Sequence, residues 1–155
     1  MTKLDGVRII EIPKFKAISS ELDSPDVIFG SFQVDGKLVK SAPPYDAPDL
    51  AIFVGDKVRW IWAANDWVSA EDAMPHDLIE FEGGIFAIGT ADENETSDCG
   101  SVYNHIIEWI NANGKFMFDD NSDRHVMCHR IGCNEVEKIL GIAQQEIFVP
   151  IKVKC

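Results

Sequence analysis

The stretch DCGSVYNHIIEWINANG at 98–114 decides the fold. Its apolar residues recur at the spacing of one helix face, which predicts an amphipathic helix over about 98–112. Gly114 stands where a left-handed C-terminal cap belongs, and Ser97 or Asp98 is expected to cap the start of the helix. The apolar residues of this face are Val102, Ile106, Trp109 and Ile110.

Strand patterns lie on both sides of this helix. Residues 78–90, LIEFEGGIFAIGT, precede it, and Gly83-Gly84 inside the pattern indicates a bulge or kink. Short apolar strands are expected after the helix, at 115–118, 125–131 and 146–153. The second half of the chain therefore predicts the order strand, helix, strand, strand.

The first half repeats this order less clearly. VRIIEIPKFKAI at 7–18 predicts an edge strand, or a strand broken at Pro13. Residues 26–34 fit a short helix or a strand equally well, and the prolines that follow them, Pro43-Pro44 and Pro48, mark a loop. LAIFV at 50–54 and KVRWIWA at 57–63 predict a β-hairpin around Gly55-Asp56. In this hairpin, the side chains of Val58, Trp60 and Trp62 share one face of the second strand.

The two halves together predict an α+β fold, a tandem of two βαββ units in a single domain over 1–155. The length of 155 residues suits one domain with a sizeable core. The repeat is one of element order and not of residue identity.

The net charge and composition limit the classes of partner that the protein can be expected to bind. The net charge is −12, from 26 acidic against 14 basic side chains, and the basic residues are scattered singly. Such a field repels a phosphate backbone, so we expect no direct nucleic-acid binding, and it attracts cationic ligands or a basic protein surface. No apolar run is long enough to span a membrane. The start has no signal-peptide core, so we expect a cytoplasmic protein with free thiols at Cys99, Cys128, Cys133 and Cys155.

Three short stretches resemble the GyrI-like small-molecule-binding domain, which is also the effector-binding domain of AraC-type and MerR-type transcription regulators. The first is VRIIEIPKFKAI at 7–18. The second is GGIFAIG at 83–89 followed by EWINANG at 108–114, and the third is the closing strand QEIFVPIKVK at 145–154. Together the three stretches extend over nearly the whole chain, although each is short.

The resemblance implies an antiparallel sheet with a groove between its two halves. In the family this groove is lined by aromatic side chains, and it often holds a buried glutamate on the penultimate strand. Here that strand is 125–131, where His129 or a neighbour stands in the place of the glutamate, and no acidic residue occurs between Arg124 and Asn134. This departure argues against both glutamate-dependent cation recognition and glutamate-dependent catalysis.

The candidate ligand-binding residues combine aromatic and acidic side chains. Trp60 and Trp62 could line the groove or pack in the core, and Trp109 is expected in the core because it lies on the apolar helix face. Glu80 and Glu82 alternate on a strand, and they face either solvent or the groove. The full set is Phe53, Trp60, Trp62, Glu80, Glu82, Tyr103, Trp109, His129 and Phe148.

His125, Cys128, His129 and Cys133 form an H-x2-C-H-x3-C pattern of residues that can bind zinc. Strand alternation, however, places the two histidines on one face and Cys128 on the other. We therefore expect no metal and no other cofactor.

The sequence thus predicts non-enzymatic binding of lipophilic, cationic or planar small molecules, by a stand-alone binder or by the sensor domain of a transcription regulator. One alternative is a hydrolase of electrophilic small molecules that uses Glu80, Glu82 or Glu146 with Tyr103 in the same groove. Another is an acidic module that binds a basic surface on gyrase or a regulator through the loop 92–98. No catalytic residue is assigned.

Overall fold

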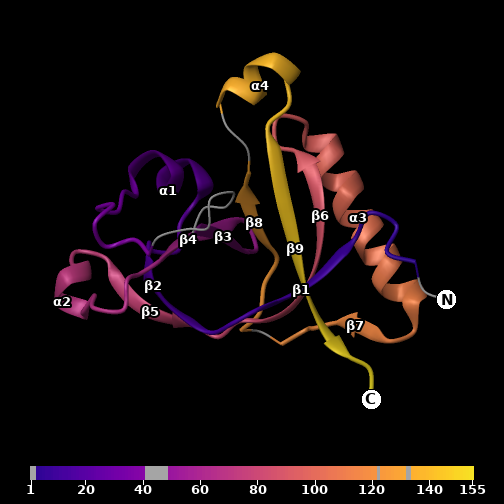
Figure 1. Ribbon diagram of the computed structural model, residues 1–155, viewed down its shortest axis with the longest axis horizontal. Coiled ribbons are helices and arrows are strands. Elements are labelled where there is room, and N and C mark those ends of the chain that lie inside the picture. Colours follow the sequence, from indigo (N-terminus) through magenta and orange to yellow (C-terminus); the bar gives the residue numbers. More distant parts are fainter. Residues whose placement is uncertain (1–2, 41–48, 122, 132–133) are drawn as a thin grey trace. The chain divides into compact units, whose positions relative to one another are not determined.

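The structure is a computed structural model that describes residues 3–40, 49–121, 123–131 and 134–155. The chain forms two compact units (Figure 1). Unit 1 consists of Met1–Ile12 and Gly84–Cys155, and unit 2 consists of Pro13–Gly83.

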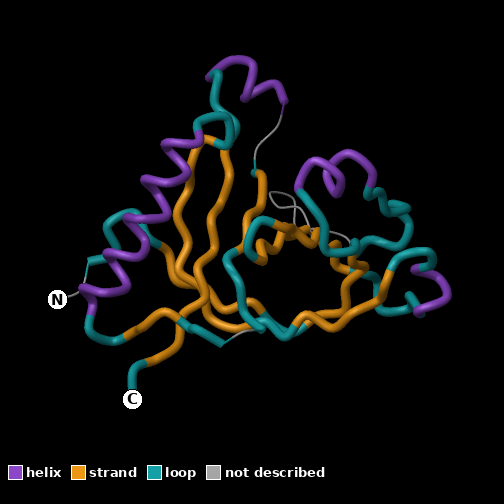
Figure 2. The backbone as a smooth tube through the Cα atoms, turned by 180° about the vertical axis from the view of Figure 1, so that it is seen from behind, coloured by secondary structure: helices purple, strands orange, loops and turns teal. Residues whose placement is uncertain are grey.

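Unit 1 is an antiparallel sheet with one long helix along it. Its strand order is β1-β6-β9-β8, and β7 pairs with the C-terminal part of β9. Helix α3 follows the long strands β6 and β9, as Figures 1 and 2 both show. The elements of unit 1 are β1 (Arg8–Ile12), β6 (Gly84–Asp92), α3 (Thr96–Asn113), β7 (Phe116–Phe118), β8 (Met127–Arg130), α4 (Asn134–Leu140) and β9 (Gln144–Val153).

The core of unit 1 lies between α3 and one face of this sheet. Ile106 and Ile110 of the helix pack with Ile147 and Val149 of β9. The helix approaches β6 so closely at Gly89 that a Cβ there would lie 2.8 Å from Cγ1 of Val102. Because side chains alternate along a strand, the residues between these core positions point to the face away from α3.

Unit 2 contains four antiparallel strands, paired in the order β3-β4-β2-β5. Helix α1 packs on one face of these strands, and the short helix α2 is held by a capping box between Ser69 and Asp72. The elements of unit 2 are β2 (Phe15–Ser19), α1 (Pro25–Ser31), β3 (Asp49–Val54), β4 (Lys57–Ala63), α2 (Ala70–Ala73) and β5 (Asp77–Phe81).

The two units repeat one pattern of pairing. The order strand, helix, strand, strand appears as β2-α1-β3-β4 and again as β6-α3-β8-β9. In each unit the last of these strands pairs with both the first and the middle one, and an additional strand, β5 or β1, pairs with the first. The α+β class and the tandem βαββ order are therefore confirmed. The groove between the halves and the treatment of 1–155 as one domain stay predictions.

The breaks expected in the strands mark where the chain passes from one unit to the other. The pattern at 7–18 is two strands, interrupted at Pro13-Lys14. The pattern at 78–90 is also two strands, and Gly83 and Gly84 between them have φ values of 74° and 128°. Non-glycine residues rarely adopt such angles, so this pair of glycines permits the change of direction.

The helices differ in part from the expectation. Residues 26–34, for which helix and strand were equally possible, include α1, whose first turn contains Pro25 at a position that favours helix initiation. Gly114 has the expected left-handed conformation, with φ of 76°. The cap predicted at Ser97 or Asp98 is wrong, because α3 begins at Thr96 and Asp98 instead accepts a hydrogen bond from the Asp92 amide at 2.7 Å.

Helix α4 was not predicted from the sequence.

The loop marked by Pro43-Pro44 and Pro48 lies outside the described residues. Among the helices of the described ranges, none has the length and apolar character needed to cross a membrane.

Candidate functional site: an aromatic cluster in unit 2

Trp60 and Trp62 project from the same face of β4, as their spacing predicts, and α1 with its C-cap residue adds two phenylalanines to them. The Trp60 and Trp62 ring centroids are 5.6 Å apart. Phe29 meets Trp60 edge-on at 5.3 Å, and Phe32 lies at 5.8 Å from it. Phe53 on β3 lies on the same face and packs against the same core. We call these five residues the Trp60 cluster: Phe29, Phe32, Phe53, Trp60 and Trp62.

The Trp60 cluster is neither fully buried nor fully exposed. Trp60, Trp62 and Phe53 are half-buried, and Phe29 is 46% exposed, whereas Phe32 is buried. Aromatic rings that pack on a core and keep part of their surface open can take a flat or lipophilic ligand without first unfolding that core.

A carboxylate lies at the edge of the Trp60 cluster. Trp60 Nε1 donates a hydrogen bond of 2.9 Å to Oδ2 of Asp49. Asp49 is the register partner of Trp62 across the β3–β4 ladder, so its side chain is on the aromatic face. The site therefore joins ring faces, which attract cations, with one fixed negative charge. The sequence analysis did not identify Asp49, although it immediately precedes the predicted strand at 50–54.

Phe148 and His129, two more of the predicted residues, lie in unit 1 on the sheet face away from α3. Phe148 is 5% exposed and packs edge-on against Phe86 at 6.2 Å between ring centroids. His129 is 4% exposed and lies directly opposite Glu146 in the β8–β9 register. Arg8 of β1 forms an ion pair with the buried Glu146 carboxylate. This face thus combines buried aromatic residues with a buried histidine and a buried glutamate, and the exposed Arg8 pairs with that glutamate.

Glu146 provides the buried acid that the sequence lacks at 125–131. It was considered only as a hydrolase residue paired with Tyr103. Tyr103 packs against the core on the α3 side of the sheet, whereas Glu146 alternates with the core residue Ile147 and faces the other way. The predicted pairing of Glu146 with Tyr103 is therefore wrong, because the sheet separates them.

The other predicted residues pack in the core or form ion pairs at the surface. Trp109 packs in the unit 1 core, as expected, and its Nε1 donates to the Lys3 carbonyl at 2.7 Å. Glu80 and Glu82 are exposed on and beside β5, where both lie within 4 Å of Lys14 Nζ. The hydrogen bond to Glu80 and the negative charges of both glutamates raise the pKa of Lys14 above its ordinary value.

Two described members of the cysteine and histidine pattern, Cys128 and His129, lie on opposite faces of the sheet. Cys128 packs against the α3 side of the sheet, and His129 points to the opposite face, as alternation predicts. Cys133 lies outside the described residues. Within the part of the chain that the structure covers, no group of three or more metal-binding side chains occurs.

Comparison with known proteins identifies the fold. No protein-family model matches the sequence, and no curated protein matches it. Among solved structures, the EcmrR C-terminal domain matches with a TM-score of 0.65 at 14% identity, over 94% of this chain and 96% of that one. A hydrolase from Listeria innocua matches with a TM-score of 0.66 at 12% identity, over 94% and 91% of the two chains.

A third match is SAV2435 bound to tetraphenylphosphonium, with a TM-score of 0.56 at 11% identity, over 94% of this chain and 93% of that one. These likenesses confirm that the chain has the GyrI-like fold that the sequence resemblance implied.

Proposed function

We propose that the protein binds lipophilic small molecules, with a preference for flat or bulky aromatic cations, at the Trp60 cluster. The observation that supports this most strongly is the half-buried Trp60 indole, which has ring neighbours at 5.3, 5.6 and 5.8 Å and a hydrogen bond to the Asp49 carboxylate. The protein would act either as a stand-alone binder or as the sensor domain of a transcription regulator.

The preference for a cation has two physical sources. An aromatic face attracts a nearby positive charge, and tryptophan does so more strongly than phenylalanine or tyrosine. Asp49 adds a carboxylate at the edge of these rings, and the net charge of −12 concentrates cations around the whole molecule. The structural match to a protein bound to tetraphenylphosphonium supports the same ligand class.

Calorimetric titration with tetraphenylphosphonium, and with the uncharged triphenylphosphine oxide, tests this proposal. Trp60→Leu removes one ring face and is expected to weaken binding of both compounds about tenfold. Asp49→Asn keeps an acceptor for the Trp60 indole and removes the charge. It should weaken binding of the cation about threefold to tenfold and leave the neutral compound unaffected.

Two control variants test whether the loss of affinity is specific to the Trp60 cluster and Asp49. Trp67→Phe changes a tryptophan that is 60% exposed and outside the Trp60 cluster, and Asp56→Asn removes a charge in the β3–β4 turn. Neither control should change the affinity for either compound. Equal affinity of the wild type and the Trp60→Leu and Asp49→Asn variants, with all chains folded, would refute the proposal.

Hydrolysis is the second function to test, because one structural neighbour is a hydrolase. In this chain Glu146 is a buried carboxylate on the face of the sheet away from α3, and Arg8 already forms an ion pair with it. That contact favours binding over catalysis. A chromatographic assay for loss of an electrophilic ester separates the two functions, because only a hydrolase consumes the compound, and Glu146→Gln would then abolish the loss.

A further inference from the structure

Helix α4 in unit 1 exposes an apolar surface that the proposed ligand site does not use. Ile139 is 76% exposed, Leu140 57%, Ile142 43% and Val136 38%, and α4 has no buried residue. We call these four residues the α4 patch. A helix of seven residues has little stability in water without packing, so a surface that covered the α4 patch would stabilise both the helix and the contact.

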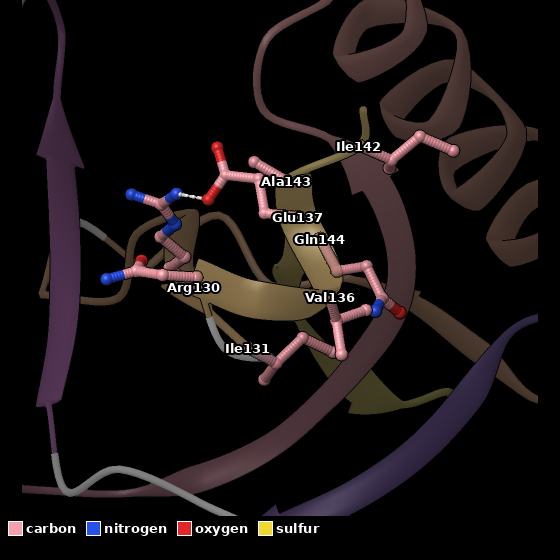
Figure 3. A pocket seen from close by; sticks show the side chains of 8 residues that line it. Arg130, Ile131, Val136, Glu137, Ile142, Ala143 and Gln144 are labelled. Atoms are coloured by element: carbon pink, nitrogen blue, oxygen red, sulfur yellow. Dashed lines mark hydrogen bonds and ion pairs between the residues drawn. The ribbon is translucent and has the colours of Figure 1, made fainter. Parts of the chain in front are cut away.

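A small pocket lies beside the α4 patch. It is a shallow hollow open to solvent, and Figure 3 shows the Arg130–Glu137 ion pair on one side of it, across from Gln144 and Ile142. Val136 and Ile142 belong both to its lining and to the α4 patch. The pocket is therefore continuous with the apolar surface.

The acidic loop 92–98 borders the same surface. The Glu93 amide donates to the Ala143 carbonyl at 2.7 Å, and the Ala143 amide donates to Asp92 Oδ1 at 3.1 Å. Glu93 also lies 3.5 Å from Arg130 Nε. These contacts fix the loop next to the end of α4. The segment 92–98 and α4 carry six acidic residues, Asp92, Glu93, Glu95, Asp98, Glu135 and Glu137. The basic residues nearby are Lys138 on α4 and Arg130, which pairs with Glu93 and Glu137.

We propose that the α4 patch is a docking surface for a basic, amphipathic segment of a partner protein. The apolar side chains of that segment would cover Ile139 and Leu140, and its lysines or arginines would face the acidic residues of α4 and of the adjoining segment 92–98. Charge disfavours a second copy of this chain, because self-association would bring two acidic rims together on molecules of net charge −12. This surface and the Trp60 cluster lie in different units, so each can be tested without the other.

The test uses the full chain and a labelled synthetic amphipathic peptide of leucine and lysine, with binding followed by fluorescence anisotropy. A peptide of leucine and glutamate with the same pattern is the matched probe. The double variant Ile139→Ser with Leu140→Ser should weaken binding of the basic peptide about tenfold or more. The pair Glu95→Gln with Glu135→Gln should weaken it and reduce its dependence on salt.

Variants in unit 2 serve as controls: Met74→Ser changes an exposed apolar residue, and Glu21→Gln with Glu71→Gln removes two exposed charges. Binding of the basic peptide that is reduced only by the α4-patch and rim variants supports the proposal. Equal binding of both peptides, or no effect of the α4-patch variants, overturns it. Sedimentation that reveals a dimer of the wild type, lost in the Ile139→Ser, Leu140→Ser variant, also overturns it, because the occupant would then be a second copy.

Discussion

The guanidinium of Arg124 lies directly over Gly84, so that a Cβ at position 84 would stand only 2.5 Å from Arg124 Nη2. Arg124 donates to the Ile85 carbonyl at 2.7 Å and to the Ile151 carbonyl at 3.0 Å, and its guanidinium carbon is 4.6 Å from the centre of the Phe86 ring. One arginine thus joins the first residues of β6 to the C-terminal part of β9, and glycine at 84 is the residue that leaves room for it.

Gly84→Ala should therefore lower the free energy of unfolding by about 2 to 4 kcal/mol, because the methyl group meets Arg124 and because φ of 128° is strained for alanine. Gly55→Ala is the matched control. It also has positive φ, of 64°, but has open space around the Cβ, so it should cost only about 1 kcal/mol. Equal losses in urea unfolding would show that the contact with Arg124 contributes nothing.

The Asp119 carboxylate, which accepts a hydrogen bond from Arg124 at 2.7 Å, makes stability depend on pH. Burial alone would raise the pKa of Asp119, but the hydrogen bonds from Arg124 and the Asn121 amide, with the positive charges of Arg124 and Lys152, outweigh it and lower the pKa below 3.8. A lowered pKa in the folded state stabilises the fold above the ordinary value of 3.8, and this contribution is lost as the pH falls through the folded-state pKa.

Asp119→Asn should accordingly destabilise the protein clearly at pH 7 and progressively less in acid below the ordinary pKa. Urea unfolding across that range provides the measurement. Asp120→Asn, at a neighbouring side chain that is 82% exposed, should have little effect at any pH. A loss for Asp119→Asn that does not vary with pH would contradict the assignment.

The three cysteines among the described residues should react with a thiol reagent in a fixed order. Burial raises the pKa of Cys128 to about 12, with smaller contributions from Cys99 and Glu93. Burial and the nearby carboxylates, Asp98 foremost, also raise the pKa of Cys99, whereas Cys155 is exposed. Because the thiolate is the reactive form, iodoacetamide should modify Cys155 first, Cys99 later and Cys128 last in the folded protein. Mass spectrometry reads each site separately, and Cys128 labelling as fast as Cys155 would show this order to be incorrect.

The ion pair of Arg8 with Glu146 should contribute more to the free energy of unfolding than the ion pairs on the surface. Glu146 has a side chain only 11% exposed, so Arg8→Met leaves a carboxylate without its cation in a mostly buried place and should cost about 1 to 3 kcal/mol. Lys14→Met breaks pairs with glutamates that are more than half exposed and should cost less. Thermal unfolding compares the two variants, and a larger loss for Lys14→Met would reverse the expected order.

Much of the fold could be predicted because its patterns are local. The periodicity at 98–114, the hairpin at 50–63 and the break at Pro13 each follow from a few neighbouring residues, and the structure contains all three. Helix α4 was missed because its apolar residues are exposed and form no face against the core. The N-cap of α3 was predicted at the wrong residue because several polar residues of 92–98 can each begin a helix. In addition, β6 extends into this segment as far as Asp92.

The candidate site could be predicted only where it rests on alternation within one strand. That rule placed Trp60 and Trp62 together, but it could not bring in Phe29 and Phe32, because the helix that carries them was not resolved from a strand. The role of Glu146 was missed for a related reason. The register that sets it opposite His129 joins two strands separated by helix α4, and the pattern within either strand does not reveal that register.

The most direct test of the central claim follows the indole N–H signals of the four tryptophans by nuclear magnetic resonance during titration with tetraphenylphosphonium. Saturable shifts of the Trp60 and Trp62 signals, with those of Trp67 and Trp109 unchanged, are the result predicted for binding at the Trp60 cluster. Shifts confined to Trp67 or Trp109, or no shift at any of the four at saturating compound, would contradict the account.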